Sequence, residues 1–190
     1  MEGEAWVMKI YRNFIAFTLA ILAFSFVSVS AQSLSDAGTT QSIERQVQKK
    51  ILKLPYYEVF DHIGFNVNGD TVTLTGKVRN ARNKKDAEAY VKDVPGVMNV
   101  VNNIEILPVG SFDDSIRVNL YRTLSNSGGL SRYLWTVNPS VRLIVDGGHV
   151  SLEGFVANRG DYNTMNVLAN GVPGVFSVTN NLVIDNGRAN

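Results

Sequence analysis

The side chains in this sequence that could do chemistry are cations and aromatic rings, and they fall into two groups. The first group is a run of cations that precedes Asp86 and contains no acidic residue: Lys77, Arg79, Arg82, Lys84 and Lys85. A cation close to an anionic membrane contributes about 1 kcal/mol to binding. Runs of charge are also typical of solvated surfaces, so the pattern predicts either contact with anionic lipid head groups or an ordinary exposed face.

The second group combines arginines with aromatic rings in two stretches: Arg117, Tyr121 and Arg122, then Arg132, Tyr133 and Trp135. Tyrosine and tryptophan suit a boundary between water and lipid, because the ring is apolar and its edge is polar. Two interpretations stay open. Either this group contacts lipid, or Leu134 and Trp135 fill the space between two packed domains.

The sequence lacks the residue patterns of a catalytic or metal-binding site. Its two histidines, His62 and His149, are far apart, and neither lies in a recognised nucleophile motif. With no cysteine, the sequence offers no disulfide and no thiolate metal ligand. Asp113 and Asp114 are typical of a helix N-terminus, where the helix dipole favours acids. We therefore expect no enzyme activity, no metal and no cofactor.

The overall charge and composition exclude one further class of function. The formal net charge is +1, which argues against binding of nucleic acid through bulk electrostatics. Hydrophobic residues make up 45% of the chain and charged residues 18%, as in ordinary globular proteins.

Residues 1–31 have the pattern of an export signal. Lys9 and Arg12 precede an uncharged, mostly apolar run that ends in small residues. This order is typical of a secretory signal peptide, so we predict cleavage after Ala31 and a periplasmic or secreted protein. The apolar run is nearly long enough to span a bilayer, so an uncleaved N-terminal membrane anchor is the alternative. The polar residues 32–42 are predicted to form a linker.

The rest of the chain contains an internal repeat. Val150 follows Val72 by 78 residues, and at this offset 15 of 43 positions are identical between residues 64–106 and 142–184. Chance identity would be roughly one position in fifteen at ordinary residue usage, so the duplication is secure. It predicts two domains and a short C-terminal tail: residues 43–108, 112–185 and 186–190.

Each copy has the hydrophobic pattern of a helix, two strands, a second helix and a third strand. In copy one, the first helical stripe consists of Ile43, Val47, Ile51 and Leu54. Val72, Leu74 and Val78 alternate with threonines, which predicts a strand with one buried face. The last strand of this copy is predicted over residues 97–107.

Copy two keeps the pattern with different side chains. Its first helical stripe consists of Ile116, Leu120 and Leu124. The expected fold class is α+β, with two tandem α-β-β-α-β modules, each a three-stranded mixed sheet covered on one face by two helices. A module of this size buries only about 60% of its unfolded surface and is marginally stable alone. The short connection over residues 108–111 therefore predicts that the two modules pack together.

Six glycines recur in pairs, one from each copy: Gly69 with Gly147, Gly76 with Gly154, and Gly96 with Gly174. The first pair lies in predicted turns between strands. The second lies inside a strand, where glycine marks a close backbone approach, and we predict that a helix packs against it. The third follows a valine and a proline and is predicted to end the preceding helix rather than to bind phosphate.

The run Val-x-Leu-x-Gly-x-Val, followed by a helix and then Val-x-Gly-Val-x-x-Val-x-Asn, resembles the BON domain of Gram-negative envelope proteins. It occurs at residues 72–102 and 150–180. Two such copies behind an export signal make the chain similar to osmotically induced periplasmic BON proteins. One departure is that copy two is longer between its first helix and its first strand.

The resemblance implies an envelope protein that contacts anionic phospholipid and supports envelope integrity under osmotic stress, without catalysis. Some members of the family behave like chaperones, so a periplasmic protein-interaction module is the alternative function. The implied partners are an anionic phospholipid or membrane surface and other envelope proteins. For the lipid-contact function, the cation run and the arginine–aromatic group are the predicted binding residues.

Overall fold

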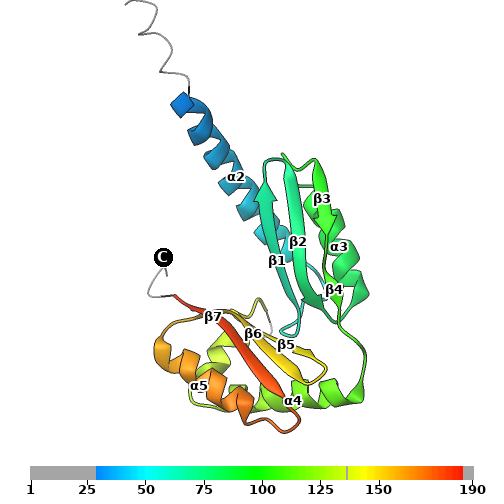
Figure 1. Cartoon of the computed structure of the whole chain (residues 1–190), viewed down its shortest axis with the longest axis vertical. Coiled ribbons are helices and arrows are strands. Elements are labelled where there is room, and N and C mark those ends of the chain that lie inside the picture. The colour runs from blue at the N-terminus through cyan, green and yellow to red at the C-terminus, as the bar shows by residue number, and fades with distance from the viewer. Residues whose placement is uncertain (1–28, 136, 186–190) are drawn as a thin grey trace, which may run out of the picture. The chain divides into compact units, whose positions relative to one another are not determined.

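The computed structural model describes residues 29–135 and 137–185 (Figure 1). The predicted signal peptide up to residue 28 and the predicted tail at residues 186–190 lie outside the described residues. The chain divides into two compact units, residues 1–42 and 43–190, and both copies of the repeat belong to the second unit. In the described part of the chain, no helix combines the length and the hydropathy that a membrane crossing needs.

Copy one forms a mixed sheet. Its strands are β1 (His62–Asn68), β2 (Thr71–Val78), β3 (Asn99–Asn102) and β4 (Glu105–Ile106). β1 runs antiparallel to β2, whereas β3 and β4 both run parallel to β2, so β2 is central. The helices are α2 (Val29–Ile51) and α3 (Ala81–Lys92). α3 connects β2 to the parallel β3, because parallel neighbours need a crossover rather than a hairpin.

Copy two repeats this arrangement and adds a short 3-10 helix. Its elements are α4 (Ser111–Ser125), η1 (Leu130–Tyr133), β5 (Val141–Asp146), β6 (His149–Val156), α5 (Arg159–Asn170) and β7 (Ser177–Ile184). β5 is antiparallel and β7 parallel to the central β6. The predicted fold class of two tandem modules with mixed sheets is confirmed. η1 occupies the stretch by which copy two is longer.

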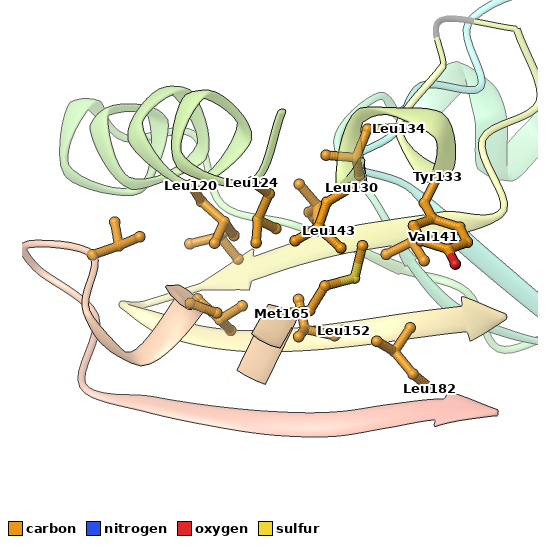
Figure 2. Packing of buried hydrophobic residues seen from close by; sticks show 14 of the residues in the cluster. Leu120, Leu124, Leu130, Tyr133, Leu134, Val141, Leu143, Leu152, Met165 and Leu182 are labelled. Atoms are coloured by element: carbon orange, nitrogen blue, oxygen red, sulfur yellow. The ribbon is translucent and has the colours of Figure 1, made fainter. Parts of the chain in front are cut away.

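Each module has its own hydrophobic core. In copy one, Val47 of α2 and Leu74 of β2 are fully buried in the same cluster. In copy two, Figure 2 shows Leu120 of α4 directed toward Leu143 of β5, with Met165 of α5 in the same layer. The predicted helical stripes and inward strand faces are therefore the cores, as the packing of helices on a sheet requires.

Local signals set the ends of the second helix in each copy. Asn80 and Asn158 are the N-caps of α3 and α5, and each side-chain oxygen accepts a backbone N–H of the first turn. Beyond the C-terminal ends, Gly96 and Gly174 have φ angles of +92° and +91°. Glycine adopts this conformation without steric cost. Both glycines lie in the turn after the helix, three residues beyond the C-caps Asp93 and Gly171, so each helix ends before the predicted stop.

Two element boundaries differ from the prediction. The polar residues 32–42, predicted as a linker, are helical and belong to α2, because this stretch has no proline and only one glycine to interrupt a helix. The last strand of copy one, predicted as continuous, is divided into β3 and β4. At the division the Asn102 side-chain oxygen accepts the backbone N–H of Ile104 at 3.2 Å. Asn180 accepts the N–H of Leu182 in the same way inside the continuous β7, so this bond alone does not divide the strand.

Gly76 and Gly154 are required for a reason other than the predicted one. Their φ angles are +111° and +112°. A Cβ atom on Gly76 would lie 2.2 Å from the carbonyl oxygen of His62, and one on Gly154 would lie 2.0 Å from that of Ser140. The close approach is therefore to the backbone at the start of the neighbouring antiparallel strand. The predicted packing of a helix against these glycines is wrong.

Candidate functional site

The two modules meet at one edge of the second sheet, which we call the joint. The backbone N–H of Leu143 in β5 donates to the carbonyl oxygen of Val59 at 2.8 Å, so copy one covers an edge that would otherwise be unpaired. Arg142, only 5% exposed, donates to the carbonyl oxygen of Glu58 at 2.8 Å and lies 4.0 Å from the Tyr57 ring centroid. These contacts confirm that the modules pack together.

Two of the candidate cations, Lys77 and Arg79, form ion pairs across the joint. Lys77 forms an ion pair with Asp146 of copy two. Arg79 pairs with Asp114 of copy two at 3.2 Å and with Glu58 of its own module at 3.6 Å. These side chains are partly exposed, so each pair contributes only about 0.2–1 kcal/mol to stability. A lipid phosphate would nevertheless have to compete with these carboxylates for Lys77 and Arg79.

Burial at the joint shifts the pKa values of several groups. The carboxyl of Asp61 is 1% exposed, and burial raises its pKa even though two backbone N–H groups donate to it. Burial lowers the pKa of His62, against the opposing effect of Glu153. Burial also raises the pKa of Tyr57, which Arg142 opposes. Desolvation is the largest cause in each case, so the joint accounts for these shifts without a catalytic role.

Part of the segment that lengthens copy two, namely Leu130, Tyr133 and Leu134, belongs to the core of this copy. Tyr133 is buried among the hydrophobic residues of the core (Figure 2). Its hydroxyl donates to Asp161, and the same oxygen accepts the N–H of Ala157 at 3.0 Å. Arg132 lies 4.8 Å from the Tyr133 ring centroid and pairs with Asp161. The predicted lipid contact is wrong for Tyr133, because its ring is in the core and its hydroxyl is bonded.

Leu134 and Trp135 separate the two interpretations of this segment. Leu134 is 2% exposed and belongs to the core of copy two, against which Val59 and Phe60 of copy one also pack. Trp135 is 67% exposed. The interpretation that the pair fills the space near the other module therefore holds for Leu134 and is wrong for Trp135.

Arg117 is another candidate that does not reach the surface. It is 2% exposed, and it donates to Asp114 at 2.8 Å and to the carbonyl oxygen of Val145 at 2.6 Å. Its predicted lipid contact is wrong, because these partners tie it between α4 and β5. Asp113 lies in the first turn of α4, as expected, and its carboxylate accepts two backbone N–H groups of the β5–β6 turn.

An apolar groove, here the α4 groove, lies beside the joint. Its first part has a volume of about 430 Å³ and is lined by Glu58, Val59, Phe60, Val118, Tyr121, Arg122 and Leu134. A second hollow of about 360 Å³ adjoins it, because Tyr121 and Leu134 line both. Exposed Trp135 and Val137 stand at this second hollow. Each volume is within the range of about 300–1,000 Å³ typical of small-molecule sites.

The remaining candidate cations lie on two different helices. Arg82, Lys84 and Lys85 lie near the N-terminus of α3, whose first turn contains no acidic residue. Arg82 also pairs with Asp86 at 3.6 Å and lies 5.5 Å from the Tyr56 ring centroid. Arg122 lies on α4 at the groove. The structure thus brings Tyr121, Arg122 and Trp135 together at one groove and leaves the α3 cations as a separate cluster.

Sequence reasoning missed two features. Phe60 lines the groove and lies edge-to-face with Tyr121 at 6.3 Å, and its hydrophobicity alone gave no sign of this place. Asn102 and Asn180 each donate to a carbonyl oxygen of the second helix and accept an N–H from the third strand. The recurrence of this asparagine in both copies was a signal that could have identified its structural role.

Comparison with known proteins shows one matching family and several similar solved structures, two of which are described below. A family model of the BON domain matches residues 39–108 and 112–186. The chain is similar to the C-terminal domain of CdsD, a structural protein of the type III secretion system of Chlamydia trachomatis, with 15% identity and a TM-score of 0.31 over 74% of this chain and 96% of that one. A second CdsD structure has 14% identity and a TM-score of 0.26 over 76% and 92%. No curated protein matches the sequence significantly.

Proposed function

Because the chain belongs to the BON domain family, we propose that it is a non-catalytic envelope protein that contacts anionic phospholipid membranes through its second module. The single observation that carries this proposal is the exposure of Trp135 at 67%, next to Val137 at 76%. Contiguous exposed apolar patches mark sites of membrane or protein contact.

The proposed contact surface consists of Val118, Arg122, Trp135 and Val137, all at the α4 groove. The indole ring of Trp135 enters the boundary between head groups and acyl chains, where the apolar ring is buried in lipid and its N–H remains hydrogen-bonded to water. The guanidinium of Arg122 binds a lipid phosphate, for which its planar donors are well suited. A surface this small binds weakly and reversibly.

The α3 cations make a second contact with anionic lipid in this proposal. Lys84 and Lys85 add positive charge at a helix N-terminus, where the helix dipole has the same sign. Each cation held near the membrane adds about 1 kcal/mol, and salt screens this contribution. The proposed function therefore places the protein at the cell envelope, after export by the predicted signal peptide.

Co-sedimentation with lipid vesicles tests the proposal. We expect the protein to bind phosphatidylglycerol vesicles more strongly than phosphatidylcholine vesicles, and Trp135→Ala to weaken binding about tenfold, or 1.4 kcal/mol. Phe155→Ala is the matched control, because Phe155 is an aromatic residue of similar exposure, 55%, away from the groove lining. In the mature chain that the predicted cleavage after Ala31 leaves, Trp135 is the single tryptophan, so its fluorescence should shift to the blue on binding.

The outcome that removes the proposal is equally weak binding to both kinds of vesicle at low and high salt. An unchanged fluorescence spectrum of Trp135 on vesicles that do bind would exclude this surface while leaving the α3 cations as the contact.

A protein-interaction role is the second candidate, because copy two exposes another aromatic pair. Phe112 and Phe176 are 48% and 69% exposed, with ring centroids 5.7 Å apart. For a chaperone-like function, Phe176→Ser should reduce suppression of aggregation of an unfolded outer-membrane protein, whereas Trp135→Ala should not. Equal activity of Phe176→Ser and the unaltered protein would remove this candidate.

A further inference from the structure

The last strand of copy two forms one edge of its sheet. β7 pairs with β6 along its whole length, and in the described part of the chain no strand pairs with its other side (Figure 1). Soluble proteins usually protect such an edge with a lysine, a proline, a bulge or a short strand. β7 is eight residues long and contains no charged residue and no proline. The equivalent strand of copy one is divided into β3 and β4 and carries Glu105, so its edge is shorter and charged.

Alternate residues of β7 direct their backbone groups away from β6. Asp185 donates its N–H to the carbonyl oxygen of Val156, so the odd-numbered residues face β6 and the even-numbered residues face outward. Most of the outward groups have no hydrogen-bond partner among the described residues. They are the N–H and C=O groups of Val178 and Ile184, the N–H of Asn180 and the C=O of Leu182.

The two remaining outward groups are already bonded within the module. The N–H of Leu182 donates to the side-chain oxygen of Asn180 at 3.2 Å. The carbonyl oxygen of Asn180 accepts the hydroxyl of Tyr162 at 3.3 Å. A strand that pairs with this edge therefore finds a fixed pattern of available and occupied groups.

The available groups match each other in one antiparallel register of two copies of β7, in which Asn181 lies opposite Asn181 of the second copy. Val178 then lies opposite Ile184 of the second copy, and the two residues exchange both of their hydrogen bonds. Asn180 lies opposite Leu182 of the second copy and donates its N–H to that carbonyl oxygen. The bond that is not made joins the N–H of Leu182 to the carbonyl oxygen of Asn180, the two groups already bonded within each module.

The side chains also match in this register. On the face covered by the helices, Val178 meets Ile184 of the second copy, and both are partly buried against the core. On the open face, Thr179 meets Val183 of the second copy, which is 54% exposed in the single chain. Cross-strand pairs of β-branched residues contribute about 0.2–1 kcal/mol each. Because β7 has no charged residue, no like charges meet.

From this match we propose that two copies of the chain form a symmetric dimer through β7, which joins their two three-stranded sheets into one. A single strand pair is smaller than the roughly 800 Å² per partner of a standard interface, so we expect a weak dimer with a Kd of about 10–100 μM. The dimer goes beyond the proposed membrane contact, because no residue of β7 lines the α4 groove.

A disulfide between two copies tests the register. The sequence has no cysteine, so a single introduced cysteine reports on its own position. Asn181→Cys places two thiols opposite each other in a non-hydrogen-bonded pair with Cα atoms about 4.5 Å apart, a distance that a disulfide spans. Thr179→Cys is the matched control on the same face of the same strand, because its two copies lie more than about 13 Å apart. On mild oxidation of the mature protein, we expect a covalent dimer from Asn181→Cys and not from Thr179→Cys.

Sedimentation equilibrium measures the dimer without a covalent bond. Asn181→Lys places two cations opposite each other and should raise the Kd at least about fivefold. Asn103→Lys is the matched control, because Asn103 is the equivalent residue of copy one at the 78-residue offset, and it should leave the Kd unchanged.

Three results would overturn the inference: a protein that stays monomeric up to about 1 mM, equal disulfide formation by Asn181→Cys and Thr179→Cys, or the same Kd for Asn181→Lys and the unaltered protein. If the protein is monomeric and an added extended peptide slows hydrogen exchange at the amides of Val178 and Ile184, the edge pairs with another protein and the second copy is excluded. These measurements contain no lipid, so their outcome is independent of the membrane contact.

Discussion

Gly76 and Gly154 are positions at which the backbone leaves no room for a side chain. We expect Gly76→Ala to lower the free energy of unfolding by about 3 kcal/mol or more, because a methyl group would meet backbone that cannot move aside and φ is +111°. Urea denaturation followed by circular dichroism measures the change. Gly128→Ala is the control, since a Cβ atom there meets nothing within 4 Å. Equal losses for the two variants would contradict the prediction.

His62 makes stability depend on pH. Burial lowers its pKa, so as pH falls the unfolded chain takes up a proton near 6.5 before the folded protein does. Proton uptake then favours the unfolded state, and the free energy of unfolding falls as pH falls through 6.5. We expect His62→Gln to remove this part of the loss of stability. Between pH 7.5 and 5.5 the urea midpoint of this variant should therefore decrease less than that of the unaltered protein.

The charged groups that face His62 are Glu153 and Arg142. Asp61 lies at the same joint and has a raised pKa. It is present both in the His62→Gln variant and in the unaltered protein, so its contribution to the pH dependence cancels when the two are compared. His149→Gln serves as the control, because His149 is exposed. A urea midpoint that falls equally in His62→Gln and the unaltered protein would exclude His62 as the group responsible.

In each copy, the side chain of one asparagine connects the third strand to the second helix by hydrogen bonds, and we call this contact the latch. Asn102 donates to the carbonyl oxygen of Lys84 at 2.9 Å and accepts the N–H of Ile104 at 3.2 Å. We expect Asn102→Ala to lower the free energy of unfolding by about 1–3 kcal/mol, because it leaves a part-buried donor and acceptor unpaired. The Ile104 amide should also exchange its hydrogen faster.

The neighbouring Asn103→Ala is the control for the latch, because the Asn103 side chain is exposed. Its effect should stay within about 0.5 kcal/mol. If the amide of Ile104 exchanged at the same rate in both variants, the latch would not be what orders this part of the sheet.

The elements could be predicted because their signals are local. Val72, Leu74 and Val78 alternate along the chain, and this alternation alone identifies the buried face of β2. The roles of Arg117 and Tyr133 could not be predicted in the same way. Their partners, Val145 and Asp161, each lie 28 residues further along the chain, and only the folded structure shows that these pairs meet.

For the whole molecule, we expect the joint to make the unfolding of the two modules cooperative. Arg142 is buried against Glu58 and Tyr57 of the other module, so its truncation leaves the carbonyl oxygen of Glu58 without this donor and removes the contact with the Tyr57 ring. We expect the unaltered protein to unfold in one calorimetric transition and Arg142→Ala to unfold in two, with the first at lower temperature. Arg159→Ala, which removes an arginine near the Tyr162 ring of the same module, should keep one transition. A single transition in Arg142→Ala would show that the modules are coupled by other contacts.

The residues of the joint have no counterparts at the equivalent places of the repeat. At the 78-residue offset Arg142 corresponds to Gly64, Asp146 to Asn68, and Lys77 to Phe155. The ion pair and the buried arginine contact therefore depend on the order of the copies, since exchanging the two modules would put Gly64, Asn68 and Phe155 where Arg142, Asp146 and Lys77 now lie.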